Sequence, residues 1–236
     1  MSGHSKWSTI KHKKGLKDQK RGKIFSRLVK QIQIAARDNP DPATNATLRT
    51  MIDKAKIENM PNANIDRAIK KASGDGKSAT LEEIILEAYG PKGSAFLIEA
   101  ITNNHNRTVA EVKHIIENNN GHMAEKGSVV WLFEHKVIIT INSSNWNEEL
   151  ELLLIDCGLE DTQKDEEDIM LLIDPRFEQQ ARKAIEDKNI KIKTEDFDQQ
   201  AKNPLEVSDI DRKKIEALNE LIDDYDDTKA VYNNLS

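Results

Sequence analysis

Cationic residues near the start of the chain have the types and spacing that could do chemistry. Lys20, Lys23, Arg27 and Lys30 follow one another at intervals of three or four residues, so in a helix they lie on one face, opposite the apolar residues. Such side chains neutralise phosphate groups, although many helices carry a basic face that contacts only water. We expect this basic stripe to face solvent and to bind a polyanion.

A polar basic segment precedes the stripe. Residues 6–15, KWSTIKHKKG, are too polar to form a core and place an aromatic residue among cations. The rings of Trp7 and His12 can stack on unpaired bases, each stack contributing roughly 1–3 kcal/mol; in the alternative, Trp7 packs on the helices. The predicted nucleic-acid-binding residues are Lys6, Trp7, Lys11, His12, Lys13, Lys14, Lys17, Lys20, Arg21, Lys23, Arg27 and Lys30.

Charge is segregated along the sequence. The chain of 236 residues has a formal net charge of −6, yet residues 1–77 hold 18 Lys and Arg against 7 Asp and Glu. The remaining residues hold 17 and 34, so they repel the polyanion that the first part attracts. We therefore expect binding at one end only, with Arg67, Lys70 and Lys71 on a later helix extending the basic surface.

The sequence lacks the motifs of catalysis, cofactor binding and metal binding. Gly76-Lys77-Ser78 imitates a phosphate-binding loop, but Lys71 stands where that motif needs glycine, and a predicted helix precedes it. No two of the six histidines are four residues apart on one helix, and the single Cys157 cannot form an intrachain disulfide or a multi-thiolate site. We expect no catalytic residues, no cofactor, no metal and no small-molecule substrate.

Composition is typical of a cytoplasmic protein. Hydrophobic residues make up 37% of the chain and charged residues 32%, and no run of about 18 apolar residues is present to span a bilayer. The first residues lack the apolar stretch of a signal peptide. We expect a monomer in the cytoplasm, without a membrane partner and long enough for two or three domains.

The basic part of the chain predicts a bundle of three amphipathic helices. Apolar residues recur at helical spacing in three segments, which are separated by Asn39-Pro40-Asp41-Pro42 and by Met60-Pro61. Proline disfavours helix at the residue before it, so each break ends a helix. The predicted helices run from near Asp18 to the first break, from Ala43 to Asn59, and from Asn62 or Asn64 to Gly74.

The acidic part alternates strand and helix patterns. Strands are predicted at residues 83–89, 95–102 and 129–133, and Thr108 with Glu111 forms a capping box that opens a helix. From Val137 the pattern is strand, helix, strand, strand, helix, strand, which is a split βαβ unit. Its predicted strands are 137–141, 160–163, 168–173 and 190–193, its helices are 148–156 and 175–187, and a final helix covers 208–221.

These elements predict an α+β fold with an N-terminal three-helix bundle and two α/β domains. The helical nucleic-acid-binding domain covers residues 1–77. The second domain combines residues 78–136 with 204–236, because the final helix needs a sheet to cover. Residues 137–203 form the split βαβ (ferredoxin-like) domain, inserted in the second.

Short motifs along the chain resemble the YebC family. That family includes bacterial proteins described as probable transcriptional regulators and the mitochondrial translational activator of cytochrome oxidase subunit one. The resemblance implies a three-domain α/β protein without catalytic activity that acts in gene expression through nucleic acid. The motifs are Gly3-His4-Ser5-Lys6-Trp7, Ile10-Lys11-His12-Lys13, Lys20-Arg21-Gly22-Lys23-Ile24-Phe25, Asn59-Met60-Pro61, Arg67-Ala68-Ile69-Lys70-Lys71, Asn106-Arg107-Thr108-Val109-Ala110-Glu111 and Gly127-Ser128-Val129.

Three functions stay open on the sequence alone. The family description favours DNA binding and regulation of transcription. A cationic segment with one tryptophan suits ribosomal RNA as well, and no helix stands out with the amide and guanidinium side chains that read base edges. The first alternative is therefore a ribosome-associated translation factor. The second is a scaffold whose acidic domains bind a protein partner.

Overall fold

The computed structural model describes residues 17–73, 81–165 and 167–235, with side chains from Gly22 onward. It begins with three helices: α2 (Lys17–Ala36), α3 (Ala46–Ile57) and α4 (Asn62–Ser73). Their apolar faces form one core, in which Ile32, Leu48 and Ala55 are fully buried. The Asn45 side chain caps α3 by accepting a hydrogen bond from the Leu48 amide at 3.0 Å. We call α2, α3 and α4 the N-terminal helices.

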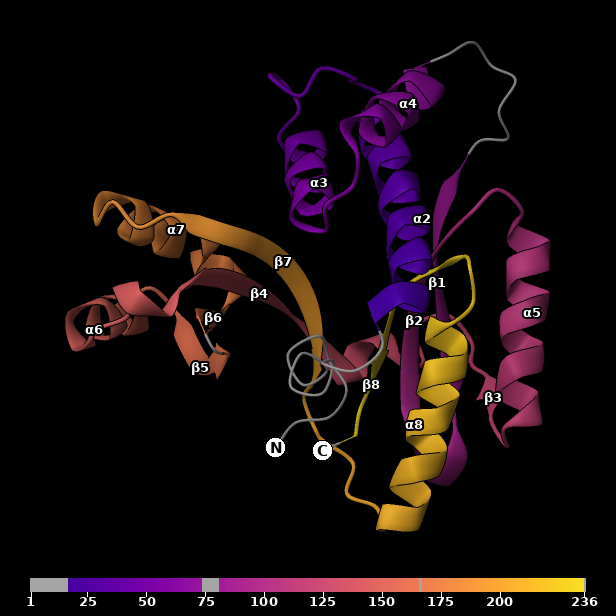
Figure 1. Cartoon of the computed structure of the whole chain (residues 1–236). Helices are drawn as coiled ribbons and strands as arrows, with labels where there is room; N and C mark the ends of the chain where they lie inside the picture. The colour runs from indigo at the N-terminus through magenta and orange to yellow at the C-terminus, as the bar shows by residue number, and fades with distance from the viewer. Residues whose placement is uncertain (1–16, 74–80, 166, 236) are drawn as a thin grey trace.

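The first sheet is antiparallel and has the strand order β3-β1-β2-β8. Its strands are β1 (Glu82–Tyr89), β2 (Ala95–Thr102), β3 (His122–Met123) and β8 (Thr228–Asn233). Helices α5 (His105–Asn118) and α8 (Asp209–Asp223) pack on one face, where Phe96 and Ile98 meet Ile116, Ile215 and Leu218. β8 comes from the end of the chain and pairs with β2, so α8 and β8 complete a sheet begun far earlier (Figure 1).

The second sheet holds β4 (Phe133–Asn142), β5 (Leu159–Asp165), β6 (Asp168–Ile173) and β7 (Ile192–Ala201) in the order β5-β6-β4-β7. Helices α6 (Glu148–Asp156) and α7 (Glu178–Asp187) bury Leu150, Leu154, Ala181 and Ile185 against it. The chain order and antiparallel pairings are those of a split βαβ unit. The predicted α+β fold is confirmed. Single 3₁₀ turns lie at Pro91–Gly93, Val130–Leu132, Ser143–Asn145 and Pro175–Phe177.

Three local predictions are wrong. The strand expected at residues 190–193 begins at Ile192 and runs to Ala201, as β7. The helix expected to open at Thr108 begins at His105, because the Asn104 side chain accepts a hydrogen bond from the Arg107 amide at 3.2 Å and caps it. Thr108 is then buried inside α5 and gives its hydroxyl to a carboxylate instead. Residues expected as a strand at 129–133 instead form a 3₁₀ turn that leads into β4.

A buried carboxylate on β1 holds that turn. Glu87 is 5% exposed, and its two oxygens accept backbone hydrogen bonds from Gly127, Val129 and Val130 at 2.6, 2.5 and 2.8 Å. Burial raises the pKa of Glu87, but these three bonds lower it by more, so the carboxylate stays charged. Glu87 thereby fixes the segment that connects the two sheets.

We predict that Glu87→Gln destabilises the protein by about 1–3 kcal/mol, because an amide turns a donor toward backbone N–H groups that need an acceptor. Glu82→Gln, at an exposed position of the same strand, is the control and should change stability by less than about 0.5 kcal/mol. Urea unfolding at neutral pH measures both variants.

The lowered pKa of Glu87 also predicts a pH effect. Its contribution is fully present above the unfolded pKa of about 4.3 and is lost as the pH falls. The difference in stability between the natural protein and Glu87→Gln should therefore shrink below about pH 4. A difference that stays constant from neutral pH down to acid would contradict the role given to this carboxylate.

Candidate nucleic-acid interface

The predicted binding residues fall into three groups in the structure. Lys17, Lys20 and Arg21 lie in the first turns of α2, but their side chains are not among those described. Lys23, Arg27 and Lys30 are described with their side chains. Outside the described residues lie Lys6, Trp7, Lys11, His12, Lys13 and Lys14.

Three cations of α2 contact an acidic segment near the other end of the chain, residues 223–227, which we call the acidic turn. Lys23 Nζ donates to a carboxylate oxygen of Asp224 at 2.8 Å and to its backbone carbonyl at 3.1 Å. Arg27 donates to a carboxylate oxygen of Asp223 at 3.0 Å and to the backbone carbonyl of the same residue. The side chains of Lys23 and Arg27 are therefore both paired with carboxylates of the same protein.

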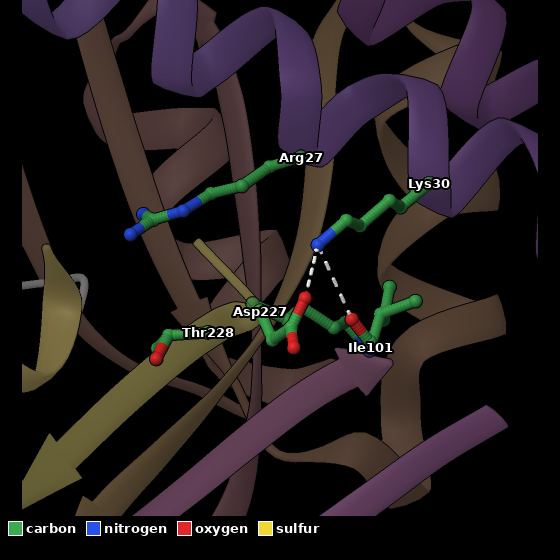
Figure 2. A pocket seen from close by; sticks show the side chains of 6 residues that line it. Arg27, Lys30, Ile101, Asp227 and Thr228 are labelled. Atoms are coloured by element: carbon green, nitrogen blue, oxygen red, sulfur yellow. Dashed lines mark hydrogen bonds and ion pairs between the residues drawn. The ribbon is translucent and has the colours of Figure 1, made fainter. Parts of the chain in front are cut away.

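Lys30 reaches deeper, into the junction between α2 and the first sheet. Figure 2 shows its ammonium group between the carboxylate of Asp227 and the backbone carbonyl of Ile101, at 2.7 and 3.4 Å. It also donates to the backbone carbonyl of Asp226 at 2.8 Å. The side chain of Asp227 is 8% exposed, against 23% for Lys30, so this pair is shielded from water.

Asp227 collects donors from several elements. Its second oxygen accepts hydrogen bonds from Arg107 at 2.8 Å, from the Thr108 hydroxyl at 2.7 Å and from the Thr102 hydroxyl at 3.2 Å. Burial raises the pKa of Asp227, but the bonds from Lys30, Thr108 and Arg107 lower it far more, to well below its usual range. The carboxylate is charged and joins α2, β2 and α5 to the start of β8.

The expectation that the basic stripe faces solvent is wrong for its three described members. Lys23, Arg27 and Lys30 point at the acidic turn, because carboxylates and free carbonyls there offer fixed acceptors at hydrogen-bond distance. The sequence does show the partner as a dense run of acids, Asp223-Asp224-Tyr225-Asp226-Asp227, although residues 165–168 form another such run. The distance of about 200 residues between the basic stripe and this partner hid the contact.

Exposed cations remain on α4. Arg67, Lys70 and Lys71 stand at i, i+3 and i+4, all three are exposed, and none forms an ion pair with another residue that the structure describes. The sequence predicted these three residues only as an extension of the basic surface of the first helix. In the described part of the chain, α4 therefore presents basic side chains that phosphates can reach.

Within the described ranges, no group of three or more His, Cys, Asp or Glu is arranged to hold a metal ion. None of the helices in those ranges combines the length and apolarity that a membrane crossing requires.

The architecture defines a class of protein: a basic helical unit followed by two antiparallel sheets, the second of split βαβ type. Residues 5–75 match the family model described as TACO1/YebC protein N-terminal domain. Residues 81–235 match the model described as TACO1/YebC second and third domain. The chain belongs to the TACO1/YebC family, so the predicted resemblance is confirmed.

Relatives match over nearly their full length. A "Probable transcriptional regulatory protein" of Syntrophomonas wolfei is 41% identical over 242 residues, covering 100% of this chain and 96% of that one. One of the same name from Prosthecochloris aestuarii is 44% identical, covering 100% and 95%. The crystal structure of a conserved hypothetical protein from Aquifex aeolicus superposes with a TM-score of 0.83 at 34% identity, covering 98% and 96%. The names of the Syntrophomonas and Prosthecochloris relatives are those of probable regulators.

We predict that Asp227→Asn lowers the stability by about 2–3 kcal/mol, because it leaves Lys30 without its counter-ion in a site that water reaches poorly. The loss stays below the roughly 3–5 kcal/mol of a fully buried pair, since Arg107 is partly exposed. Asp226→Asn is the matched control, because the side chain of Asp226 is exposed and only its backbone carbonyl binds Lys30. Thermal and urea unfolding of both variants measure the difference.

The sign of the pH dependence follows from the lowered pKa of Asp227. The contribution of its charge is present above the unfolded pKa of about 3.9 and disappears as the pH falls below it. Equal stability of Asp227→Asn and the natural protein at neutral pH would refute the anchoring role.

Proposed function

We propose that this protein regulates gene expression by binding nucleic acid, without catalysis, through its basic N-terminal segment together with the exposed face of α4. The observation that carries the proposal is the set of exposed cations on α4, which lies in the same basic part of the chain as residues 6–23. The phosphates of a nucleic acid supply the negative charge that would neutralise these cations. The relatives' names support regulation of transcription, and therefore DNA, as the first target.

The chemistry of α4 bears on how DNA would be read. Lys70 and Lys71 neutralise phosphates, which fixes position on a duplex but carries no sequence information. Arg67 is the one guanidinium on this helix that could pair with a guanine edge. We therefore propose binding governed by the phosphate backbone with shallow sequence preference.

Ribosomal RNA is the second candidate, favoured by Trp7 among the lysines of residues 6–15. Folded RNA offers unpaired bases on which an indole ring stacks, whereas the bases of a DNA duplex are already stacked on one another. The two targets therefore differ in their dependence on Trp7.

The first test changes the α4 cations together. Arg67→Gln, Lys70→Gln and Lys71→Gln should weaken binding to a DNA duplex and reduce the slope of log affinity against log salt by roughly one for each cation lost. The natural protein should show a slope of roughly −4 to −5, for about five or six phosphate contacts. Fluorescence anisotropy over a salt series measures both.

The control for this variant removes the same charge elsewhere. Lys126, Lys183 and Lys213 are exposed cations of the acidic part of the chain, and changing all three to Gln alters the net charge equally. If this control loses as much affinity as the α4 variant, net charge and not the α4 face governs binding, and the proposal fails. A flat salt dependence of the natural protein would refute phosphate binding altogether.

Trp7→Ala separates the two targets. We expect it to weaken binding to a folded ribosomal RNA fragment by roughly 1–3 kcal/mol and to leave binding to a DNA duplex nearly unchanged. Thermal stability within about 0.5 kcal/mol of the natural protein would show that the lost ring contacted RNA and not the helices. Capture of a protein partner unaffected by removal of residues 1–15, with no nucleic acid bound, would favour the scaffold.

A further inference from the structure

We propose that the acidic turn is an internal competitor for the basic face of α2. Nucleic-acid phosphates displace Asp223 and Asp224 from Arg27 and Lys23, while the pair of Lys30 with Asp227 holds α2 on the first sheet. The inference rests on the proposed function and deepens it. It names the surface of α2 that binding exposes and the contact that regulates it.

The N-terminal helices meet the rest of the protein through charges. Every hydrophobic residue of their core in the described ranges lies between Ile24 and Ala72, so this core does not run on into either sheet. The ion pairs that cross from these helices in the described ranges are those of α2 with the acidic turn and that of Lys54 of α3 with Asp196 of β7. Such contacts can be exchanged for other charges without exposing an apolar surface.

The two outer pairs are built for exchange. Exposed fractions are 41% and 63% for the side chains of Lys23 and Asp224, and 21% and 39% for those of Arg27 and Asp223. Water and salt reach both pairs, and exposed ion pairs of this kind hold weakly. Phosphate oxygens, like carboxylate oxygens, accept charge-assisted hydrogen bonds, and Arg in particular can bind either group through two parallel N–H donors.

The inner pair behaves differently. Asp227 is shielded, and its second oxygen is held by Arg107, Thr108 and Thr102, so no incoming phosphate takes its place without breaking the start of β8 and α5. Lys30 therefore stays bound while Lys23 and Arg27 change partner. An isolated phosphate gains little against two carboxylates already in position, whereas a polymer brings several phosphates at once. The acidic turn thus favours dense polyanions over single nucleotides.

The test uses the full chain with Asp223→Asn and Asp224→Asn combined, and a labelled DNA duplex of about 20 base pairs as the probe. Removal of the competing carboxylates should tighten binding by roughly three- to thirtyfold. The matched control is Glu148→Gln with Glu151→Gln on α6, two exposed acids that change the net charge by the same amount. Equal tightening in both variants would show that only net charge matters and would overturn the proposal.

A second measurement needs no substitution. A carbodiimide activates a carboxylate, and an amine in contact then displaces the resulting urea to form an amide, so the reagent joins only touching pairs. Lys23 Nζ and the Asp224 carboxylate, at 2.8 Å, should give a cross-linked peptide pair by mass spectrometry. Saturating DNA duplex should strongly reduce its yield, while a reference cross-link between Lys188 and Glu149, at 2.5 Å, should not change.

The outcomes separate the two proposals. Binding of DNA with an unchanged yield of the Lys23 to Asp224 cross-link would overturn the displacement and leave the proposed function standing. No binding of DNA or RNA by the natural protein or by either variant would overturn both. A reduced yield with DNA, together with tighter binding by the Asp223 and Asp224 variant than by its control, is the result that the structure leads us to expect.

Discussion

The buried carboxylate of Asp227 is the interaction on which the arrangement of this protein depends. It accepts from Lys30 of α2, from Thr102 at the end of β2 and from Thr108 in the first turn of α5, and it stands one residue before β8. A charged oxygen pair that little water reaches is tolerated only while all these donors stay in place. The side chain of Asp227 thereby joins the N-terminal helices to the first sheet and to the start of β8.

This arrangement changes what the segregated charge of the sequence means. The basic first part and the acidic remainder are separate along the chain, but α2 and the acidic turn bring the two signs together in space. Pairing within the protein weakens the positive electrostatic potential with which the basic part of the chain would attract a polyanion. The cations of α4 have no such partner among the described residues, so under the proposed function α4 is the first surface to meet nucleic acid and α2 is reached later.

Local pattern was enough for most of the fold and failed where distant residues decide. Periodicity and prolines located the three helices, and nearly continuous apolar runs located β2 and β6. The start of α5 was misplaced because Thr108, which imitates a capping residue, is needed by Asp227, and Asn104 caps the helix instead. β8 was missed since its place is set by pairing with β2, about 130 residues earlier. For the same reason the stripe on α2 was found, but its acidic partners were not.

The buried carboxylate of Glu87 and the exposed outer pairs of α2 join parts of the protein in contrasting ways. Glu87 is held by three backbone amides, whose positions are fixed by the turn that they belong to, so the connection between the two sheets is rigid. The contact of α2 with the acidic turn depends on flexible side chains, and its outer pairs reach solvent. Exchange of partners therefore requires no backbone rearrangement at α2, whereas at Glu87 it would unfold the turn. The outer pairs of α2 can therefore change partner while Lys30 stays on Asp227 and Glu87 keeps the turn between the two sheets.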